Sequence, residues 1–190
     1  WEDVAEAIRT LVVRGAPAIG VAAAFGVVLA ARQSRATTFD GLWGDLETAI
    51  KGLAATRPTA VNLFWALERM KRLSLGAREL PLPEVRARLL REAEAVRAED
   101  IAANRAMGAF GADLVPSSAR ILTHCNAGAL ATAGYGTALG VIRAAHEQGK
   151  VALVWVDETR PVMQGSRLTA WECVREGIPH RLWPTWRPPR

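Results

Sequence analysis

In the first hundred or so residues, apolar side chains recur every three or four positions, the spacing of one face of an α-helix. Breaks near Pro17, Pro58 and Pro81 separate these periodic segments, because proline starts or ends helices rather than continuing them. The pattern predicts helices over about 4–11, 17–32, 38–55, 61–73 and 82–110.

The pattern changes near Pro116. Short apolar runs typical of strands then alternate with helical segments, in the order strand 120–124, helix 135–147, strand 151–156, helix 169–176 and a strand from Ile178. This order is the opening of a parallel, doubly wound sheet. We therefore predict an α + α/β fold: a helical N-terminal domain over 1–115, then an α/β domain over 116–190 that holds the first half of such a sheet. Because open parallel sheets have more strands, the third strand would be an edge beside an unfilled core.

Composition excludes several classes of protein. A chain of 190 residues that is 50% apolar is long enough to bury a core and too apolar to be disordered. The net charge of +5 and the pI near 10 suggest a nucleic-acid partner. From Ile178 onward, however, the chain has three arginines and no acid, so a short tail carries most of the excess. We find no aromatic and basic platform elsewhere and predict no nucleic-acid partner.

The cysteines and the apolar stretches indicate the cellular compartment to expect for this protein. Cys125 and Cys173 are too few for a disulfide scaffold or a four-ligand zinc site, and we predict no metal. The apolar stretch from Pro17 to Ala31 contains two glycines and is predicted to be a buried helix, with no membrane contact. The N-terminus opens with Trp-Glu-Asp and does not resemble a secretory leader. We expect a cytoplasmic protein.

Polar residues follow the first predicted strand, where parallel sheets bind ligands. Cys125 lies at a strand-to-helix junction, where helix dipoles favour a thiolate; a buried, inert thiol is an equally good interpretation. Backbone N–H groups near Gly128 and Ala129 are predicted to receive an anion. A histidine in the position of His124 more commonly fills space or caps a neighbouring element than takes part in catalysis.

The second strand ends in a similar polar stretch. Asp157, Glu158 and Arg160 have the chemistry to hold sugar hydroxyls, or to pair with one another. Gln164 precedes the next helix, where it is able to donate to a phosphate or a hydroxyl.

Two arginine loops precede helices in the N-terminal part. Arg14 is followed by Gly15 and Ala16 just before a helix start, and Arg57 lies in a similar position. A guanidinium beside free backbone N–H groups suits a phosphate, although loop arginines are commonly just solvated. Neither of the standard glycine-rich nucleotide loops is present.

The same segments carry a family resemblance. They read Ala-Ile-Arg-Thr-Leu-Val-Val-Arg-Gly-Ala-Pro-Ala-Ile-Gly from Ala7, Thr-Arg-Pro-Thr-Ala-Val-Asn-Leu from Thr56, Thr-His-Cys-Asn-Ala-Gly from Thr123 and Val-Asp-Glu-Thr-Arg-Pro-Val-Met-Gln-Gly from Val156. In this order, over about 4–180, the chain resembles the S-methyl-5-thioribose-1-phosphate isomerase family of methionine salvage. That family is related to the regulatory subunits of translation initiation factor 2B.

The resemblance implies a fold, a reaction and a set of site residues. It implies a Rossmann-like second domain, a homodimer, and aldose-to-ketose isomerisation of 5-methylthioribose 1-phosphate to 5-methylthioribulose 1-phosphate, without a metal or other cofactor. By position, Cys125 would be catalytic. The residues that would bind this phosphorylated sugar are Arg14, Gly15, Ala16, Arg57 and Gln164.

Departures from the family pattern lead to a further expectation. The family's catalytic aspartate and an Asn-Lys pair lie beyond the third strand, and a β-rich stretch precedes the position of Trp1; this chain has no counterpart of them. We therefore expect a truncated member with impaired isomerase activity. The alternative is a non-catalytic, initiation-factor-2B-like regulatory or scaffold protein.

Overall fold

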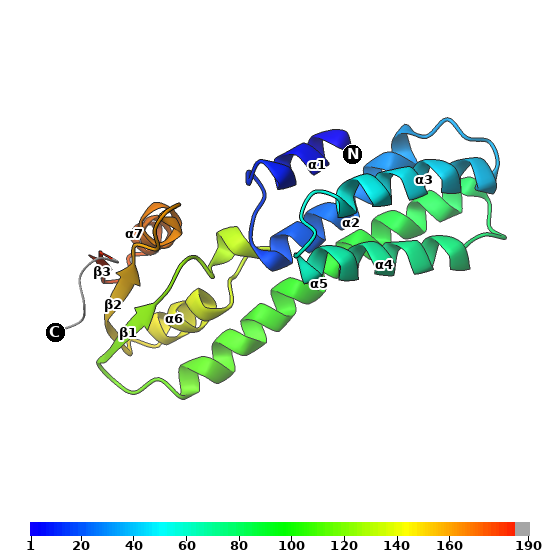
Figure 1. Ribbon diagram of the computed structural model, residues 1–190. Helices are drawn as coiled ribbons and strands as arrows, with labels where there is room; N and C mark the ends of the chain where they lie inside the picture. Colours follow the sequence, from blue (N-terminus) through cyan, green and yellow to red (C-terminus); the bar gives the residue numbers. More distant parts are fainter. Residues whose placement is uncertain (185–190) are drawn as a thin grey trace. The chain divides into compact units, whose positions relative to one another are not determined.

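The computed structural model describes residues 1–184 and divides into two compact units, Trp1–Glu99 and Asp100–Arg190 (Figure 1). The sequence predicted a boundary at 115/116, but the division between the units falls within helix α5 (Leu82–Asp113), between Glu99 and Asp100. The last turns of α5 belong with the sheet: Ala112 is part of the second core, and its carbonyl accepts a hydrogen bond from Lys150 Nζ at 2.8 Å. The proline-rich end at 185–190 lies outside the described residues.

The first unit is a helical bundle, as the apolar periodicity predicts. Its elements are α1 (Glu2–Arg9), α2 (Ala16–Gln33), α3 (Phe39–Ala54), α4 (Val61–Gly76) and the first part of α5. The apolar faces meet in one core, whose largest fully buried side chains are Ile8, Val27, Leu42, Leu46, Leu53, Leu63, Met70, Val85 and Leu89. Removing this surface from water is the main stabilising term of the bundle.

Helix α2 is 18 residues long and apolar enough, by length and composition, to cross a membrane. Half of its residues are buried inside the protein, where it packs on α3 and α4. The helices α2 and α4 begin at the same end of the bundle (Figure 1). They approach so closely at Gly20 that an added Cβ would lie 2.9 Å from the Asn62 carbonyl oxygen.

The second unit contains a parallel sheet in the order β1 (Ala119–Thr123), β2 (Val151–Asp157), β3 (His180–Trp183). This confirms the predicted strand–helix alternation. The register pairs Thr123 with Val156, so the carboxyl ends of β1 and β2 lie level with each other. That alignment positions the loops that follow these strands.

Two helices connect the strands. They are α6 (Ala138–Glu147) and α7 (Ala170–Arg175), and a five-residue π-helix, η2 (Gly165–Thr169), precedes α7. The sequence predicted that the first of them starts at Tyr135, but it starts three residues later. Gly136 has a φ of +97° and forms a β-bridge to Gly128, and neither feature is compatible with helix.

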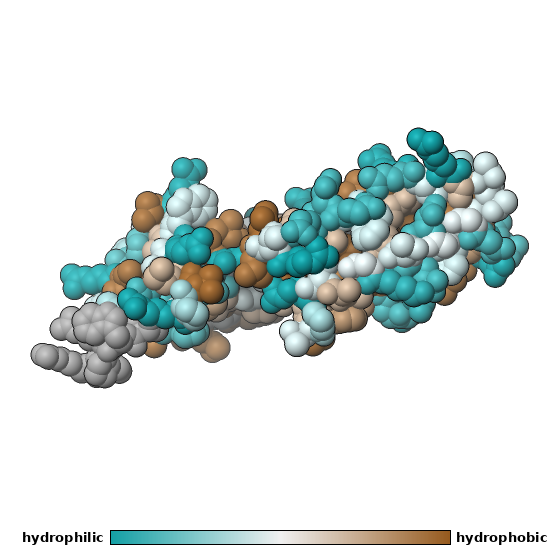
Figure 2. All heavy atoms as spheres, turned by 45° about the horizontal axis from the view of Figure 1, so that its top comes forward, coloured by the Kyte–Doolittle hydropathy of each residue, from teal (hydrophilic) through white to brown (hydrophobic). Residues whose placement is uncertain are grey.

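The second core lies between the sheet and these helices. It contains Ala112, Leu139, Ile142, Ala144, Ala145, Val151, Val154, Val156, Cys173 and Ile178. Apolar side chains also reach the surface of this unit, where Leu114, Leu122 and Val174 are each more than 60% exposed. Figure 2 shows apolar residues on the surface among the polar ones.

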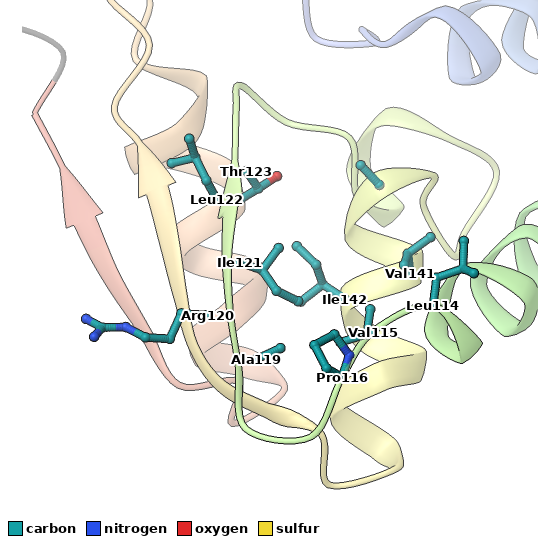
Figure 3. Close-up of a pocket in the computed structure, with 11 residues that line it drawn as sticks. Leu114, Val115, Pro116, Ala119, Arg120, Ile121, Leu122, Thr123, Val141 and Ile142 are labelled. Atoms are coloured by element: carbon teal, nitrogen blue, oxygen red, sulfur yellow. The ribbon is translucent and has the colours of Figure 1, made fainter. Parts of the chain in front are cut away.

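The strand β1 is an edge of the sheet. Among residues 1–184 it pairs with β2 alone, and an apolar hollow of about 570 Å³ runs along its other side. In Figure 3, Ile121 points toward Ile142 of α6 within this hollow, and Arg120 points away from it. The sequence predicts an edge beside an unfilled core at the third strand. Within residues 1–184, β3 is indeed an edge of the sheet, but the apolar hollow lies beside the other edge, at β1.

Candidate sugar-phosphate site

The predicted site residues fall into two groups, one in each unit. Arg14, Gly15, Ala16 and Arg57 belong to the helical bundle. Cys125 and Gln164 belong to the α/β unit.

The Arg14 loop ends at the uncapped start of α2. Gly15 is the N-cap residue with φ +89° and ψ 133°, a left-handed φ that favours glycine. It contributes no side-chain cap, so N–H groups of the first turn, including that of Ala16, have no side-chain acceptor there. An uncapped helix start of this kind attracts an anion.

The guanidinium of Arg14 is itself unsatisfied. Its Nη2 atom is buried and has no hydrogen-bond partner in the part of the chain that the structure describes. Buried polar atoms are nearly always hydrogen-bonded, and leaving one unpaired costs about 1–3 kcal/mol. An anionic ligand would supply the missing acceptor.

Arg57 lies in a matching position before α4. The N-cap residue of α4, Ala60, also provides no side-chain cap, and its N–H donates to the Arg57 carbonyl at 3.0 Å. Because Gly20 and Asn62 are in contact, the starts of α2 and α4 are neighbours. The bundle therefore gathers two arginine loops and two uncapped helix starts at one end.

In the α/β unit, Cys125 follows the carboxyl end of β1. Its φ of +59° is left-handed, a conformation that costs a residue other than glycine about 1–3 kcal/mol and persists only when surroundings hold it. Its carbonyl accepts a hydrogen bond from Thr169 Oγ1 at 2.6 Å, and Thr169 is buried in η2. The cysteine is half-buried.

Buried Glu172 holds the loop after Cys125. Its carboxylate accepts hydrogen bonds from Asn126 Nδ2 at 2.9 Å, from the N–H of Ala129 at 2.7 Å and from the N–H of Leu130 at 3.4 Å. The sequence predicted that these backbone groups would receive an external anion, and this prediction is wrong. The protein's own carboxylate, from α7, occupies that position.

Arg143 on α6 balances the charge of Glu172. Its Nη2 lies 3.3 Å from Glu172 Oε2 and also donates to Glu176, while its Nη1 donates to the Tyr135 carbonyl. Burial opposes the charged guanidinium, but the hydrogen bonds and charges of Glu176 and Glu172 outweigh it and raise the pKa of Arg143. Arg143 therefore keeps its charge inside the unit.

Gln164 lies at the same edge of the sheet as Cys125. The next residue, Gly165, packs on the end of β2 so closely that an added Cβ would lie 1.6 Å from the Asp157 carbonyl oxygen. The Gly165 N–H donates to Thr159 Oγ1 at 2.8 Å. This contact and the Thr169–Cys125 bond bring both ends of η2 to the carboxyl ends of the strands.

The charged residues after β2 pair locally. Arg160 Nε lies 2.9 Å from Glu158 Oε2, and Asp157 Oδ2 lies 3.0 Å from His124 Nδ1. The structure thus shows the mutual pairing that the sequence left open for Glu158 and Arg160, whereas Asp157 pairs with His124 instead. His124 is 72% exposed, so it does not fill the core.

Sequence reasoning missed Glu172, Arg143 and Thr169. A signal was present: Glu172 lies between buried Thr169 and Cys173 at helical spacing, on the side of the helix that faces the core. An acid at such a position is rarely buried without a partner.

The hollow beside β1 is a poor match for a phosphorylated sugar. It is lined mainly by apolar residues, and its one charged lining residue, Arg120, points outward (Figure 3). The Arg120 guanidinium lies over the Trp155 ring. Within residues 1–184, no group of three or more His, Cys, Asp or Glu side chains is placed to hold a metal ion.

The two cysteines are expected to differ in reactivity. Burial and the charge of Glu172 raise the pKa of Cys173 to about 11, so almost none of it is thiolate at about pH 8. Iodoacetamide should therefore alkylate Cys125 and spare Cys173 in the folded chain, as peptide mass spectrometry can measure. Urea should make both react, and equal labelling without urea would contradict the prediction.

Comparison with known proteins gives one family and a consistent set of relatives. The model of the initiation factor 2 subunit family matches residues 12–184. A methylthioribose-1-phosphate isomerase of Syntrophotalea carbinolica is 61% identical over 182 residues, which are 96% of this chain and 53% of that relative. The chain thus spans about half the length of the curated relatives it matches.

Two solved structures are similar to the whole described fold. The crystal structure of 5-methylthioribose 1-phosphate isomerase from Pyrococcus horikoshii has a TM-score of 0.92 at 49% identity, over 96% of this chain and 51% of that one. A structure named translation initiation factor eIF-2B, subunit delta, from A. fulgidus has a TM-score of 0.86 at 48% identity, over 96% and 53%.

Proposed function

Because the chain belongs to the initiation factor 2 subunit family, we propose that it serves the isomerase branch of that family and binds 5-methylthioribose 1-phosphate. The reaction would be its aldose-to-ketose conversion into 5-methylthioribulose 1-phosphate, in methionine salvage. The observation that carries this proposal is the buried Arg14 Nη2, which has no partner among the described residues and lies beside an uncapped helix start. The names of the similar proteins support it.

The chemistry of this substrate explains why these residue types are needed. The anomeric oxygen carries the phosphate, so the sugar cannot open as a free aldose does. Ring opening requires a proton on the ring oxygen, and hydrogen must then move from C2 to C1. In this proposal Arg14, Arg57 and helix N–H groups hold the phosphate and so orient the sugar. Gln164 contacts the sugar, and Cys125 stabilises the transition state or moves a proton.

Binding tests the proposal directly. Titration calorimetry with 5-methylthioribose 1-phosphate should give saturable binding, and Arg14→Ala should weaken it about tenfold or more, because a charge-assisted hydrogen bond is worth about 1.5–3 kcal/mol. Arg72→Ala is the control, since Arg72 is exposed and pairs only loosely with Glu68 at 3.7 Å. Absence of binding by the unaltered chain would overturn the proposal.

The similarity to the structure named eIF-2B subunit delta keeps a second candidate function in view. A regulatory or scaffold protein would act through its surface and would have no need of the sugar. Binding of a protein partner that Arg14→Ala leaves unchanged, together with no sugar-phosphate binding, would favour that function.

We also infer that copies of this chain associate as homodimers. The open edge of β1, the apolar hollow beside it and the 65% exposure of Leu122 support this, because uncovered strand edges recruit partners. Sedimentation velocity should show association that grows with concentration and that Leu122→Lys reduces. Val61→Lys is the control, on an exposed residue of the helical unit. A strict monomer would contradict the inference.

Two free cysteines fit a reducing compartment, and we expect the protein in the cytoplasmic fraction of its cells. Recovery with the membrane or secreted fraction would contradict this.

A further inference from the structure

His124 and Asp157 form a pair across the ends of two neighbouring strands. Their side chains meet at 3.0 Å, between Nδ1 and Oδ2. Because the register pairs Thr123 with Val156, His124, which follows β1, comes next to Asp157, the last residue of β2. The Asp157 side chain is 20% exposed and that of His124 is 72% exposed, so a largely buried carboxylate holds an accessible ring.

This contact selects the hydrogen-bonding roles of the ring. An ionised carboxylate only accepts hydrogen bonds, so Nδ1 is the nitrogen that carries hydrogen. The other nitrogen, Nε2, is then an acceptor when the ring is neutral and a donor when it is protonated. A carboxylate-oriented histidine with Nε2 accessible is a common arrangement of acid–base residues.

The pair lies at the same sheet edge as Cys125 and Gln164, the predicted site residues of the α/β unit. Cys125 is the next residue along the chain, and Gly165, which follows Gln164, packs against the Asp157 carbonyl. The charged groups nearest along the loop after β2 are Glu158 and Arg160, which pair with each other at 2.9 Å. From α7, Glu172 is bonded to the loop at 126–130. Asp157 is thus the acidic group that contacts the ring.

We propose that His124, oriented by Asp157, is a proton-transfer residue of the sugar-phosphate site; this inference rests on the function proposed above. The protonated ring gives its Nε2 proton to the ring oxygen of the sugar as the C1–O bond breaks, and the bonding pair goes to that oxygen. The hydrogen on C2 then moves with its electron pair to C1. The 2-hydroxyl becomes the carbonyl, and its proton returns to Nε2. Atoms and charge balance without another reactant.

The number of protons taken up when the ligand binds tests this role of His124 in the unaltered chain. Calorimetry of 5-methylthioribose 1-phosphate binding near pH 7, in two buffers of different ionisation enthalpy, measures the protons taken up on binding. His124→Gln should abolish the part of this uptake that belongs to the imidazole and weaken binding about tenfold. Asp157→Asn, which leaves His124 in place but alters its partner, should reduce the uptake. His146→Gln, on α6, should behave as the unaltered chain does.

Inorganic phosphate separates a sugar contact from a general charge effect. Because Nε2 is assigned to sugar oxygens, His124→Gln should leave phosphate binding within about twofold of the unaltered chain, whereas Arg14→Ala should weaken it. If proton uptake and affinity for the sugar phosphate are unchanged in His124→Gln, the role of His124 is overturned while the proposed function stands. No sugar-phosphate binding by the unaltered chain would overturn the proposed function, and this inference with it. Circular dichroism confirms that each variant is folded.

Discussion

Replacing Glu172 by alanine is expected to destabilise the α/β unit by about 3–5 kcal/mol, the usual cost of removing one partner of a buried ion pair. Glu172 is 2% exposed, and its loss leaves buried Arg143 with Glu176 alone as an acidic partner. It also removes the acceptor of the Ala129 N–H and of Asn126 Nδ2. Each buried donor left unpaired adds to the cost.

Urea unfolding followed by circular dichroism, with hydrogen exchange to assign the transition to residues 119–183, measures this loss. Glu84→Ala is the matched control, because Glu84 is exposed and its carboxylate pairs with Arg88 and Arg91 at the surface. Hydrogen bonds from these arginines lower the pKa of Glu84, yet water screens such pairs, and the control should differ little from the unaltered chain. An equal loss of stability in the two variants would refute the role of Glu172.

Glu172→Gln separates charge from shape. Glutamine keeps one acceptor oxygen and the side-chain volume but loses the charge that faces Arg143. We expect an intermediate loss of stability. Because the loop at 126–130 follows Cys125 directly, faster alkylation of Cys125 should accompany it. A stable variant with unchanged Cys125 reactivity would show that the carboxylate charge is not needed.

Gly165→Ala is expected to be the most damaging of the small substitutions. Its φ is not in the left-handed range, so backbone preference does not forbid alanine. A steric clash does forbid it, because the added Cβ would lie 1.6 Å from the Asp157 carbonyl oxygen. That oxygen is a backbone atom, which no side-chain rotation can move away. Either η2 or the end of β2 must shift, and we expect a loss of at least about 3 kcal/mol.

The control for this substitution is Gly44→Ala in helix α3, where an added Cβ meets nothing within 4 Å. Alanine there should raise stability by about 0.5–1 kcal/mol, because glycine is the poorer helix former. Urea midpoints of the two variants check both expectations. A Gly165→Ala protein as stable as the unaltered chain would contradict the close packing of η2 on β2.

The order and type of the helices and strands could be predicted from the sequence, because apolar periodicity is a local property. The helix over 38–55 is an example: Thr38 caps it, and Leu42, Leu46 and Leu53 are all fully buried. Predictions of helix type and helix start were poorer where contacts between distant residues determine the backbone conformation. The delayed start of α6 depends on the bridge between Gly128 and Gly136, and the π-helix depends on contact with the end of β2.

The candidate site divides in the same way. Motifs in the sequence indicated which loops are candidates for chemistry. The structure shows that the Arg14 loop ends at an uncapped helix start, and phosphate binding there stays a prediction. The second predicted anion position, at Gly128 and Ala129, failed because an acid 43 residues away fills it. Sequence spacing cannot show that a helix returns a carboxylate to a loop.

By itself, then, the sequence determined the elements, the polar loops at their ends and a family resemblance, since each depends on residues that are close together in the chain. Only the tertiary structure decided which polar groups are already satisfied. Packing α7 against the loop after β1 joins Glu172 to its backbone amides, and the parallel register joins His124 to Asp157. The bundle, in contrast, leaves Arg14 Nη2 buried without an acceptor among the described residues. Desolvation makes that distinction matter, because a buried polar atom must find its partner within the fold or in a ligand.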